Sequence, residues 1–122
     1  MRLPASRRLF RHSEFARVKA EGRSQRGRHV VISVLRTGED VPWRCGFITS
    51  RKVGNAVMRN RVRRRLREIL RSVGGQIPQG CWLVTIARWQ AAETTFQELR
   101  EDWLKAAVRA GVLREKPNHE VA

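Results

Sequence analysis

Acidic residues are scarce in this chain of 122 residues. It has 11 Asp and Glu against 26 Lys and Arg, which leaves a formal charge of +15 at neutral pH. It also lacks tyrosine and has only two cysteines and three histidines. A charge of this size and sign favours a polyanionic partner, with nucleic acid first and an anionic membrane surface second.

Long apolar runs are missing as well. No stretch approaches the roughly 18 apolar residues of a membrane-spanning helix, and the basic N-terminus has no apolar segment of the kind found in secretory signals. Cys45 and Cys81 each stand alone inside an apolar run, which predicts buried, reduced thiols in a cytoplasmic protein. Together with the scattered His12, His29 and His119 they show no zinc-ligand spacing.

The chain is expected to form a single domain over residues 1–122, with flexible ends at 1–8 and 114–122. Apolar periodicity and turn residues predict the order helix, two strands, helix, strand, helix, with the polar stretch 22–28 as a loop or a weak edge strand. The expected ranges are 14–21 (helix, capped by Ser13), 29–35 (strand), 43–50 (its antiparallel partner strand), 56–73 (helix), 81–87 (strand buried on both faces) and 95–110 (helix).

This order predicts an α/β two-layer sandwich on a small mixed sheet, written α-β-β-(β)-α-β-α with the weak strand in parentheses. Asn55 is the expected cap of the second helix, and Gly74 with Gly75 is its expected stop. Thr95 and Glu98 form a capping box for the last helix. The connection through the second helix is a βαβ crossover, which the general rule predicts to be right-handed.

Residues 51–71, RKVGNAVMRNRVRRRLREILR, contain nine Arg or Lys and one acid, Glu68, so nine minus one gives this stretch +8. On a helical wheel Val62 starts an apolar stripe, which predicts a folded helix packed on the core; Arg59 falls close to that stripe. The other cations cover nearly every remaining face. Like charges at i, i+4 spacing repel by roughly a few tenths of a kcal/mol per pair. A purely structural helix would mix signs, so this surface is interpreted as an RNA-binding surface rather than a solvated charged face.

The segment SRKVGNAVMRNRVRRRLRE, residues 50–68, resembles the signature of the bacterial ribonuclease P protein subunit. That signature runs Ser-Lys-Lys-x-Gly-x-Ala-Val-x-Arg-Asn-Arg-x-Lys/Arg-Arg-x-x-Arg-Glu, and Arg51 stands here in place of its first lysine. A looser likeness includes the pattern RLxxxxEF near the N-terminus and the VTIAR segment at 84–88.

The resemblance implies an accessory subunit of the endoribonuclease ribonuclease P, which removes the 5′ leader of precursor tRNA. The catalytic RNA subunit and precursor tRNA are the implied partners, with no membrane and no obligate protein partner. The RNA is implied to supply the catalytic groups and to bind most of the Mg²⁺. The implied fold is of the ribosomal protein S5 domain 2 type, with a left-handed crossover against the general rule.

The resemblance also assigns roles to individual residues. Phe15 is the implied aromatic of a cleft that holds the single-stranded leader, and Arg63 lies at its rim. Lys19 and Ser33 stand where some relatives carry aromatics, which implies weaker or displaced base stacking. The residues implied to contact the catalytic RNA are Ser50, Arg51, Lys52, Asn55, Arg59, Asn60, Arg61, Arg64, Arg65 and Arg67.

The residues themselves leave three alternatives: a structural RNA-binding protein of ribosomal type, a nuclease with its own active site, and a membrane-surface binder. The sequence shows no nucleophile–base arrangement for a nuclease, and the basic helix has no spare bulky apolar face to insert into a membrane. Six aromatics in or beside apolar segments are interpreted as core or boundary residues: Phe10, Phe47, Trp43, Trp82, Trp89 and Trp103.

Overall fold

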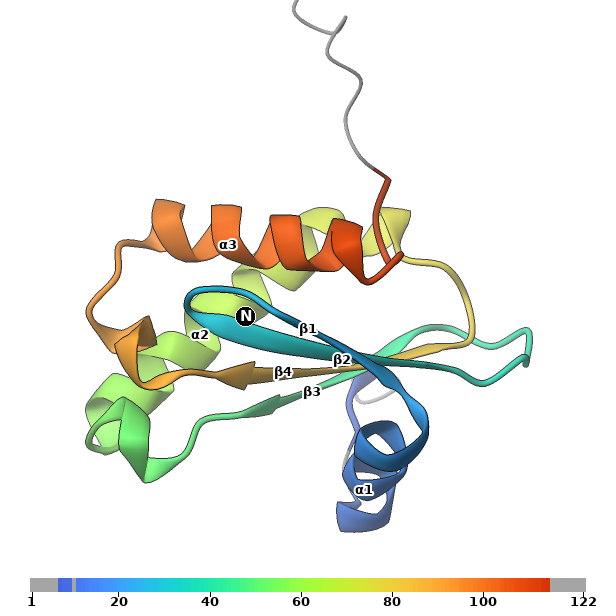
Figure 1. Cartoon of the computed structure of the whole chain (residues 1–122), viewed down its shortest axis with the longest axis horizontal. Coiled ribbons are helices and arrows are strands. Elements are labelled where there is room, and N and C mark those ends of the chain that lie inside the picture. The colour runs from blue at the N-terminus through green and yellow to red at the C-terminus, as the bar shows by residue number, and fades with distance from the viewer. Residues whose placement is uncertain (1–6, 10, 115–122) are drawn as a thin grey trace, which may run out of the picture.

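The computed structural model describes residues 7–9 and 11–114. It shows a four-stranded sheet with α2 and α3 on one face and α1 on the other, which confirms the α/β sandwich (Figure 1). The elements are α1 (His12–Glu21), β1 (Arg23–Arg26), β2 (Val30–Arg36), β3 (Arg44–Ile48), α2 (Ala56–Val73), β4 (Cys81–Ala87) and α3 (Phe96–Arg109), with short 3-10 helices η2 (Arg51–Val53), η3 (Gly74–Gln76) and η4 (Trp89–Ala92).

The strand order is β1-β2-β4-β3, so the strand that comes last in the sequence lies inside the sheet. β2 is antiparallel to both β1 and β4, and β3 is parallel to β4. The prediction that 43–50 pairs antiparallel with 29–35 is therefore wrong. The strand CWLVTIA is apolar at nearly every position, so it is best buried between two other strands, and it separates them. The stretch 22–28 contains the edge strand β1.

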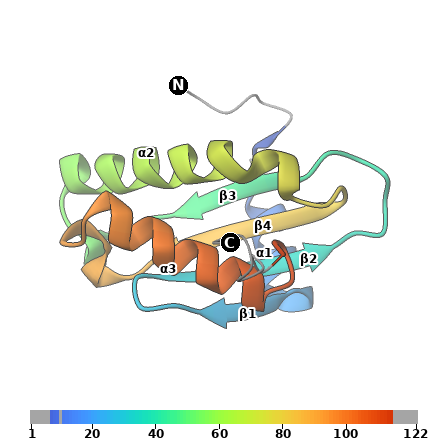
Figure 2. The ribbon, with the colours of Figure 1, turned by 90° about the horizontal axis from the view of Figure 1, so that it is seen from above.

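The crossover from β3 through α2 to β4 is left-handed. Figure 2 looks at the sheet through α2 and α3, and in it both parallel strands point left with β4 below β3. With the strands turned to point up and the helix in front, the second strand lies to the left of the first. The general preference for right-handed crossovers fails here, and the expectation from the family resemblance is confirmed.

The main core lies between the sheet and the helix pair. The predicted stripe of α2 is fully confirmed, and Leu99 and Trp103 of α3 are completely buried beside it. The Trp103 indole N–H donates to Thr85 Oγ1 at 3.0 Å, so the polar atoms that α3 and β4 bring into the core satisfy each other. The buried residues of the α2 stripe are Val62, Leu66, Ile69, Leu70 and Val73.

Two of the predicted helix starts are confirmed and one is wrong. Asn55 Oδ1 accepts from the Met58 N–H at 2.9 Å, and Thr95 forms its capping box with Glu98. The first helix begins at His12 rather than after Ser13. The reason is that the Glu14 carboxylate accepts the Arg11 N–H at 2.9 Å and also an Arg44 guanidinium at 2.8 Å. These bonds fix the first turn two residues earlier than a cap at Ser13 would.

The end of α2 is at Val73, as predicted, but Gly74 does not adopt a left-handed cap conformation; its φ is −55°. Its lack of a side chain serves packing instead, because an added Cβ would lie 2.9 Å from Trp43 Cζ2. The Trp43 indole N–H also donates to the Gly74 carbonyl at 2.9 Å. Close approach of an aromatic ring therefore explains this glycine.

Asp102 of α3 connects that helix to the turn between β1 and β2. Its carboxylate accepts the backbone N–H groups of Arg28, His29 and Val30 at 2.8, 2.7 and 3.2 Å. An acid in this basic chain thus has a structural role. Among the described residues no helix is long and apolar enough to cross a membrane.

The flexible ends predicted at 1–8 and 114–122 fall mostly outside the described residues, as does Phe10. Of the described residues at the N-terminal side, Arg7 places its guanidinium 4.4 Å from the centre of the Trp43 ring. Leu9 donates its N–H to the Cys45 carbonyl at 2.8 Å. These contacts attach the segment before α1 to β3.

Candidate RNA-binding surface

The surface of α2 opposite its core stripe is cationic, as the wheel predicts. Arg61 and Arg64 are exposed, and among the described residues neither has a hydrogen-bond or ion-pair partner within the protein. Arg59 is half-buried, as expected from its place beside the stripe, and its Nε is buried without a hydrogen-bond partner in the described part of the chain. The exposed guanidiniums are thus available to phosphate oxygens.

Other arginines of α2 are held by the protein itself. Arg63 donates to Thr49 Oγ1 at 2.9 Å and to Asn60 Oδ1 at 2.6 Å, so the amide oxygen of Asn60 is already used. Arg65 turns toward α3 and donates to the Thr94 carbonyl at 2.9 Å. These bonds place their guanidiniums in fixed positions, which reduces the conformational entropy that binding would otherwise cost.

The single acid of the basic segment is neutralised. Glu68 forms an ion pair with Arg71 at 3.0 Å, one turn beyond the exposed pair of arginines. It also lines a shallow hollow of about 370 Å³ with four other residues, which are Arg61, Arg64, Arg65 and Phe96. A guanidinium beside the one carboxylate leaves this face with a net positive charge.

A second group of predicted residues lies where β3 leaves the sheet. Ser50 Oγ accepts the Lys52 N–H at 3.3 Å and so caps η2, while Asn55 caps α2. Arg51 and Lys52 are exposed beside them. The side chains of Ser50 and Asn55 therefore stabilise the turn between β3 and α2. Arg51 and Lys52 lie in this turn, close to the N-terminus of α2, where the helix dipole favours anions.

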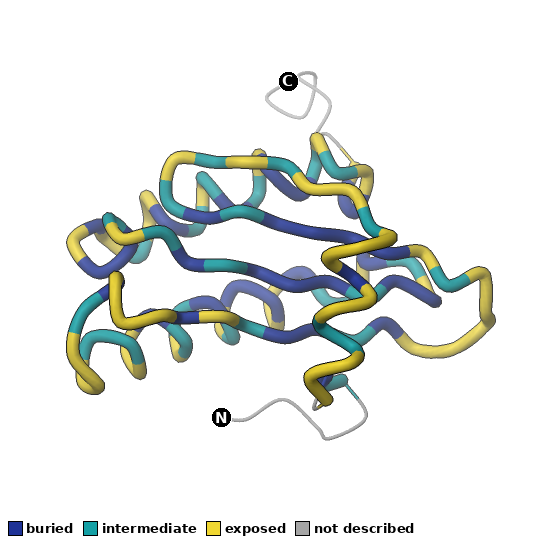
Figure 3. Tube along the Cα trace, turned by 60° about the horizontal axis from the view of Figure 1, so that its bottom comes forward, coloured by how far each residue is buried: buried dark blue, intermediate teal, exposed yellow. Residues whose placement is uncertain are grey.

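A cleft lies on the other face of the sheet, under α1. Figure 3 shows α1 crossing the strands of this face and leaving part of it uncovered. The cleft consists of two adjoining hollows of about 570 and 330 Å³ that share Phe15 and Phe47. The second hollow reaches Arg63 and Arg67 of α2, so the cleft opens onto the cationic helix. The structure thus brings Phe15 and Arg63 to one cleft, as predicted.

Phe15 sits in this cleft because β3 has a glycine below it. A Cβ on Gly46 would lie 2.5 Å from Phe15 Cε1 and Cζ, so only glycine lets the ring lie on the strand backbone. Phe15 is half-buried, with part of its ring available to a ligand.

Sequence reasoning missed the floor of the cleft. The interpretation of Phe47 as core or boundary is confirmed, since it is half-buried and packs against the main core, and part of it also lines both hollows. Ile48 and Ile86 are paired across β3 and β4 and also line the first hollow. The alternation of β3 was the available signal, since Gly46 and Ile48, two residues apart, face α1, whereas Cys45 and Phe47 are on the side of the main core.

Comparison with known proteins places these features in a family. A sequence model of the family described as Ribonuclease P matches residues 3–111. A ribonuclease P protein component from Symbiobacterium thermophilum is 42% identical over 107 residues, covering 88% of this chain and 93% of the relative. The chain belongs to the ribonuclease P family.

Solved structures of ribonuclease P proteins share the fold. The protein from Staphylococcus aureus superposes with a TM-score of 0.82 at 27% identity, covering 88% of this chain and 98% of that one. The protein from Thermotoga maritima superposes with a TM-score of 0.73 at 31% identity, covering 90% and 98%. The family relation therefore extends over the sheet, the helices and the left-handed crossover.

In this member of the ribonuclease P family, Lys19 and Ser33 do line the cleft. Ser33 Oγ is 2.7 Å from Ser24 Oγ, and Ser33 is buried. Lys19 is exposed. With a cation and a small hydroxyl at these places, Phe15 is the aromatic ring that α1 contributes to the cleft.

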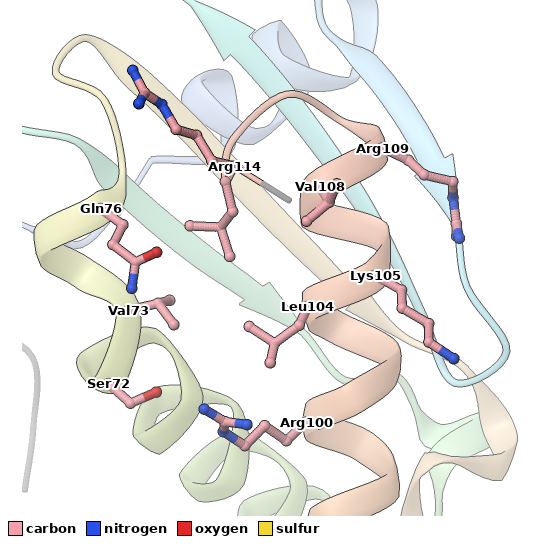
Figure 4. Close-up of a pocket in the computed structure, with 10 residues that line it drawn as sticks. Ser72, Val73, Gln76, Arg100, Leu104, Lys105, Val108, Arg109 and Arg114 are labelled. Carbon is pink, nitrogen blue, oxygen red and sulfur yellow. The ribbon is translucent and has the colours of Figure 1, made fainter. Parts of the chain in front are cut away.

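A groove on the helical face is separate from the predicted site. It has a volume of about 390 Å³ and lies between the end of α2 and the second half of α3 (Figure 4). Its floor is apolar, with Val73, Leu104 and Val108, and arginines and a lysine surround it. No predicted RNA-binding residue of this ribonuclease P family member lines the groove.

The thiols and acids offer little chemistry to this family member. Burial raises the pKa of the Cys45 thiol to about 12, and burial also raises the pKa of Cys81, so both thiols are protonated at neutral pH. Hydrogen bonds from Thr95 lower the pKa of Glu98, which acts as a helix cap. No cluster of three or more His, Cys, Asp or Glu residues within 7–9 and 11–114 is placed to hold a metal ion.

Proposed function

We propose that this chain is the protein subunit of a ribonuclease P, which binds a catalytic RNA and the 5′ leader of precursor tRNA and aids removal of that leader. The observation that carries the proposal is the continuity of the surface. The cleft under α1 opens at Arg63 and Arg67 onto the cationic face of α2. One protein can therefore contact a single strand in the cleft and a folded RNA at the helix.

The chemistry of the donors supports a positioning role for the protein. Its cations offset the repulsion between two RNAs, and its fixed guanidiniums orient phosphates. Mg²⁺ prefers carboxylate and water oxygens, but the one acid of the basic segment, Glu68, is paired with Arg71. We therefore assign Mg²⁺ binding mainly to the RNA, and cleavage to groups of the RNA. The predicted contacts at Ser50, Arg51, Lys52 and Asn55 are part of this proposal.

Precursor tRNA processing tests the proposal when it is measured with the protein alone, with the cognate RNA alone and with both together. We expect no cleavage by the protein alone and a clear stimulation of the RNA by the protein at low Mg²⁺. Cleavage by the protein alone would overturn the assignment of catalysis to the RNA. An absence of stimulation would favour the alternative, a structural RNA-binding protein of ribosomal type.

We predict that Phe15→Ala weakens binding of leader-bearing precursor by about 10-fold and leaves binding of mature tRNA nearly unchanged. The reason is that base–aromatic stacking contributes on the order of 1–3 kcal/mol per base, and only the precursor carries an unpaired leader. The measurement is the Kd of each tRNA for the complex of protein and catalytic RNA.

Phe15→Leu is the matched control, since leucine keeps apolar contact with the backbone of Gly46 but has no aromatic face. It should lose most of the same affinity and unfold at nearly the wild-type temperature. Equal losses for precursor and mature tRNA would show that Phe15 is only a packing residue.

A further inference from the structure

Trp89 differs from the other tryptophans of the protein in being on the surface. Its side chain is 58% exposed, whereas Trp43 and Trp103 are 5% and 0% exposed. The interpretation of Trp89 as a core or boundary residue is therefore wrong. Single exposed apolar residues are common, so the position of this one in the fold decides whether it has a role.

The sheet topology places Trp89 beside the cationic turn at the end of β3. β3 and β4 are parallel, with Ile48 paired to Ile86, so their carboxyl ends leave the sheet at the same edge. Arg51 follows Ile48 by three residues, and Trp89 follows Ile86 by three residues. Figure 1 shows η2, the start of α2 and η4 together at this end of the molecule. The carboxyl edge of parallel strands is where α/β proteins commonly bind ligands.

The backbone that carries Trp89 is held firmly. Arg88 donates its N–H to the His29 carbonyl at 2.8 Å and its guanidinium to the Gly27 carbonyl at 3.1 Å. On the other side, Ala91 and Ala92 are buried and close η4. The indole therefore projects from a rigid support, which lowers the entropic cost of using it as a contact surface.

The charge of the segments near the Trp89 indole indicates which kind of molecule binds there. The segments 50–57 and 88–92 contain three cations and no acidic residue, and the first acid that follows is Glu93. An aromatic ring on a cationic surface is the arrangement by which proteins bind unpaired nucleotides: cations contact phosphates, and bases stack on the ring. An acidic protein segment would use the cations but has no particular need for an aromatic face.

We propose that Trp89 is a stacking platform for an unpaired base of RNA bound at η2 and the start of α2. This inference rests on the proposed function and adds to it a contact point outside the cleft of Phe15. The base belongs either to the catalytic RNA or to the leader of precursor tRNA, and the chemistry of recognition is the same for both.

The test uses the full-length variants Trp89→Ala, Trp89→Phe and Trp89→Leu. Their Kd values are measured over a range of salt concentrations for the catalytic RNA alone, and then for precursor and mature tRNA on the complex. We expect Trp89→Ala to weaken one of these affinities by about 5- to 100-fold and Trp89→Phe to stay within about 3-fold. Trp89→Leu should resemble the alanine variant, since leucine is apolar but cannot stack.

The salt dependence separates stacking from loss of phosphate contacts. No variant removes a charge, so the slope of log affinity against log salt should equal the wild-type slope. Wild-type tryptophan fluorescence should also be quenched by RNA, and most of this quenching should disappear in Trp89→Phe. A loss for catalytic RNA alone assigns the base to that RNA; a loss only for precursor assigns it to the leader.

Val41→Ala is the matched control, because Val41 is an exposed apolar residue (37%) in the connection between β2 and β3, before the start of β3 and away from η2 and η4, and has no aromatic face. Its RNA affinity should match the wild type. Wild-type affinity in Trp89→Ala or Trp89→Leu, or an equal loss in Val41→Ala, would overturn the stacking role. Failure of the wild-type protein to bind catalytic RNA would instead overturn the proposed function.

Discussion

Replacing Arg61 and Arg64 together with alanine should weaken binding of the catalytic RNA by on the order of 100-fold at low salt, because charge-assisted hydrogen bonds contribute about 1.5–3 kcal/mol each. Both side chains are exposed and, in the described part of the chain, make no hydrogen bond or ion pair with the protein. The fold should therefore be unaffected, and relief of like-charge repulsion along α2 should if anything stabilise it slightly.

The salt dependence of the same binding reaction gives a second readout. If the protein contacts about four to six phosphates, the wild-type log–log slope is roughly −3 to −5. Loss of two contacts should make it less steep by roughly 2. Kd values from filter binding at several salt concentrations measure both effects.

Arg28→Ala combined with Lys105→Ala is the matched control. It lowers the net charge by the same amount but removes exposed cations from the β1–β2 turn and from α3. A small loss in the control and a large loss in the α2 variant would assign the binding energy to the helix surface. Equal losses in both would mean that the total charge of the protein matters and that α2 is not a specific site.

Trp103→Ala should lower the free energy of unfolding by about 3–5 kcal/mol, as large-to-small changes of buried aromatics do. Trp103 is the largest completely buried side chain of the described residues and lies between α3 and the sheet. A domain of this size is typically stable by about 5–15 kcal/mol, so the variant should be close to unfolding. Urea denaturation followed by circular dichroism measures the change.

A double-mutant cycle with Thr85 separates the hydrogen bond of Trp103 from its packing. Trp103→Phe leaves the buried Thr85 hydroxyl without its 3.0 Å donor, and Thr85→Val leaves the indole N–H without its acceptor. The double variant removes both partners and should recover part of the cost, because an unsatisfied buried group is worse than an absent one. Additive losses would show that the hydrogen bond contributes nothing beyond packing.

Local patterns explain which parts of the fold were predictable. The α2 stripe repeats at helical spacing, and its cap at Asn55 lies next to it in the sequence, so both were found without the structure. The capping box of Thr95 with Glu98 is equally local. These features depend on residues within one turn of each other, and backbone geometry alone relates them.

The errors share a different cause. The prediction that Ser13 caps a helix starting at residue 14 was wrong because the first turn of α1 is also held by Arg44, which is distant in sequence. The pairing of β3 was wrong because β4, further along the chain, pairs with both candidate partners. Trp89 was interpreted as a core or boundary residue because it lies at the end of an apolar segment, yet the sharp turn at η4 leaves it exposed. In each case contacts between distant segments outweighed local propensity.

The sequence by itself determined that the protein is strongly cationic, that its charge is concentrated on one amphipathic helix, and which residues of that helix are buried. Net charge and the spacing of apolar residues are fixed by the order of residues in the chain. They do not depend on how the helices and strands pack. Only the tertiary structure decided that Phe15 and Arg63 share one cleft, that Arg65 faces α3, and that η4, which carries Trp89, lies beside η2, which carries Arg51. These relations follow from the parallel pairing of β3 with β4 and the left-handed crossover, which depend on packing between segments far apart in the sequence.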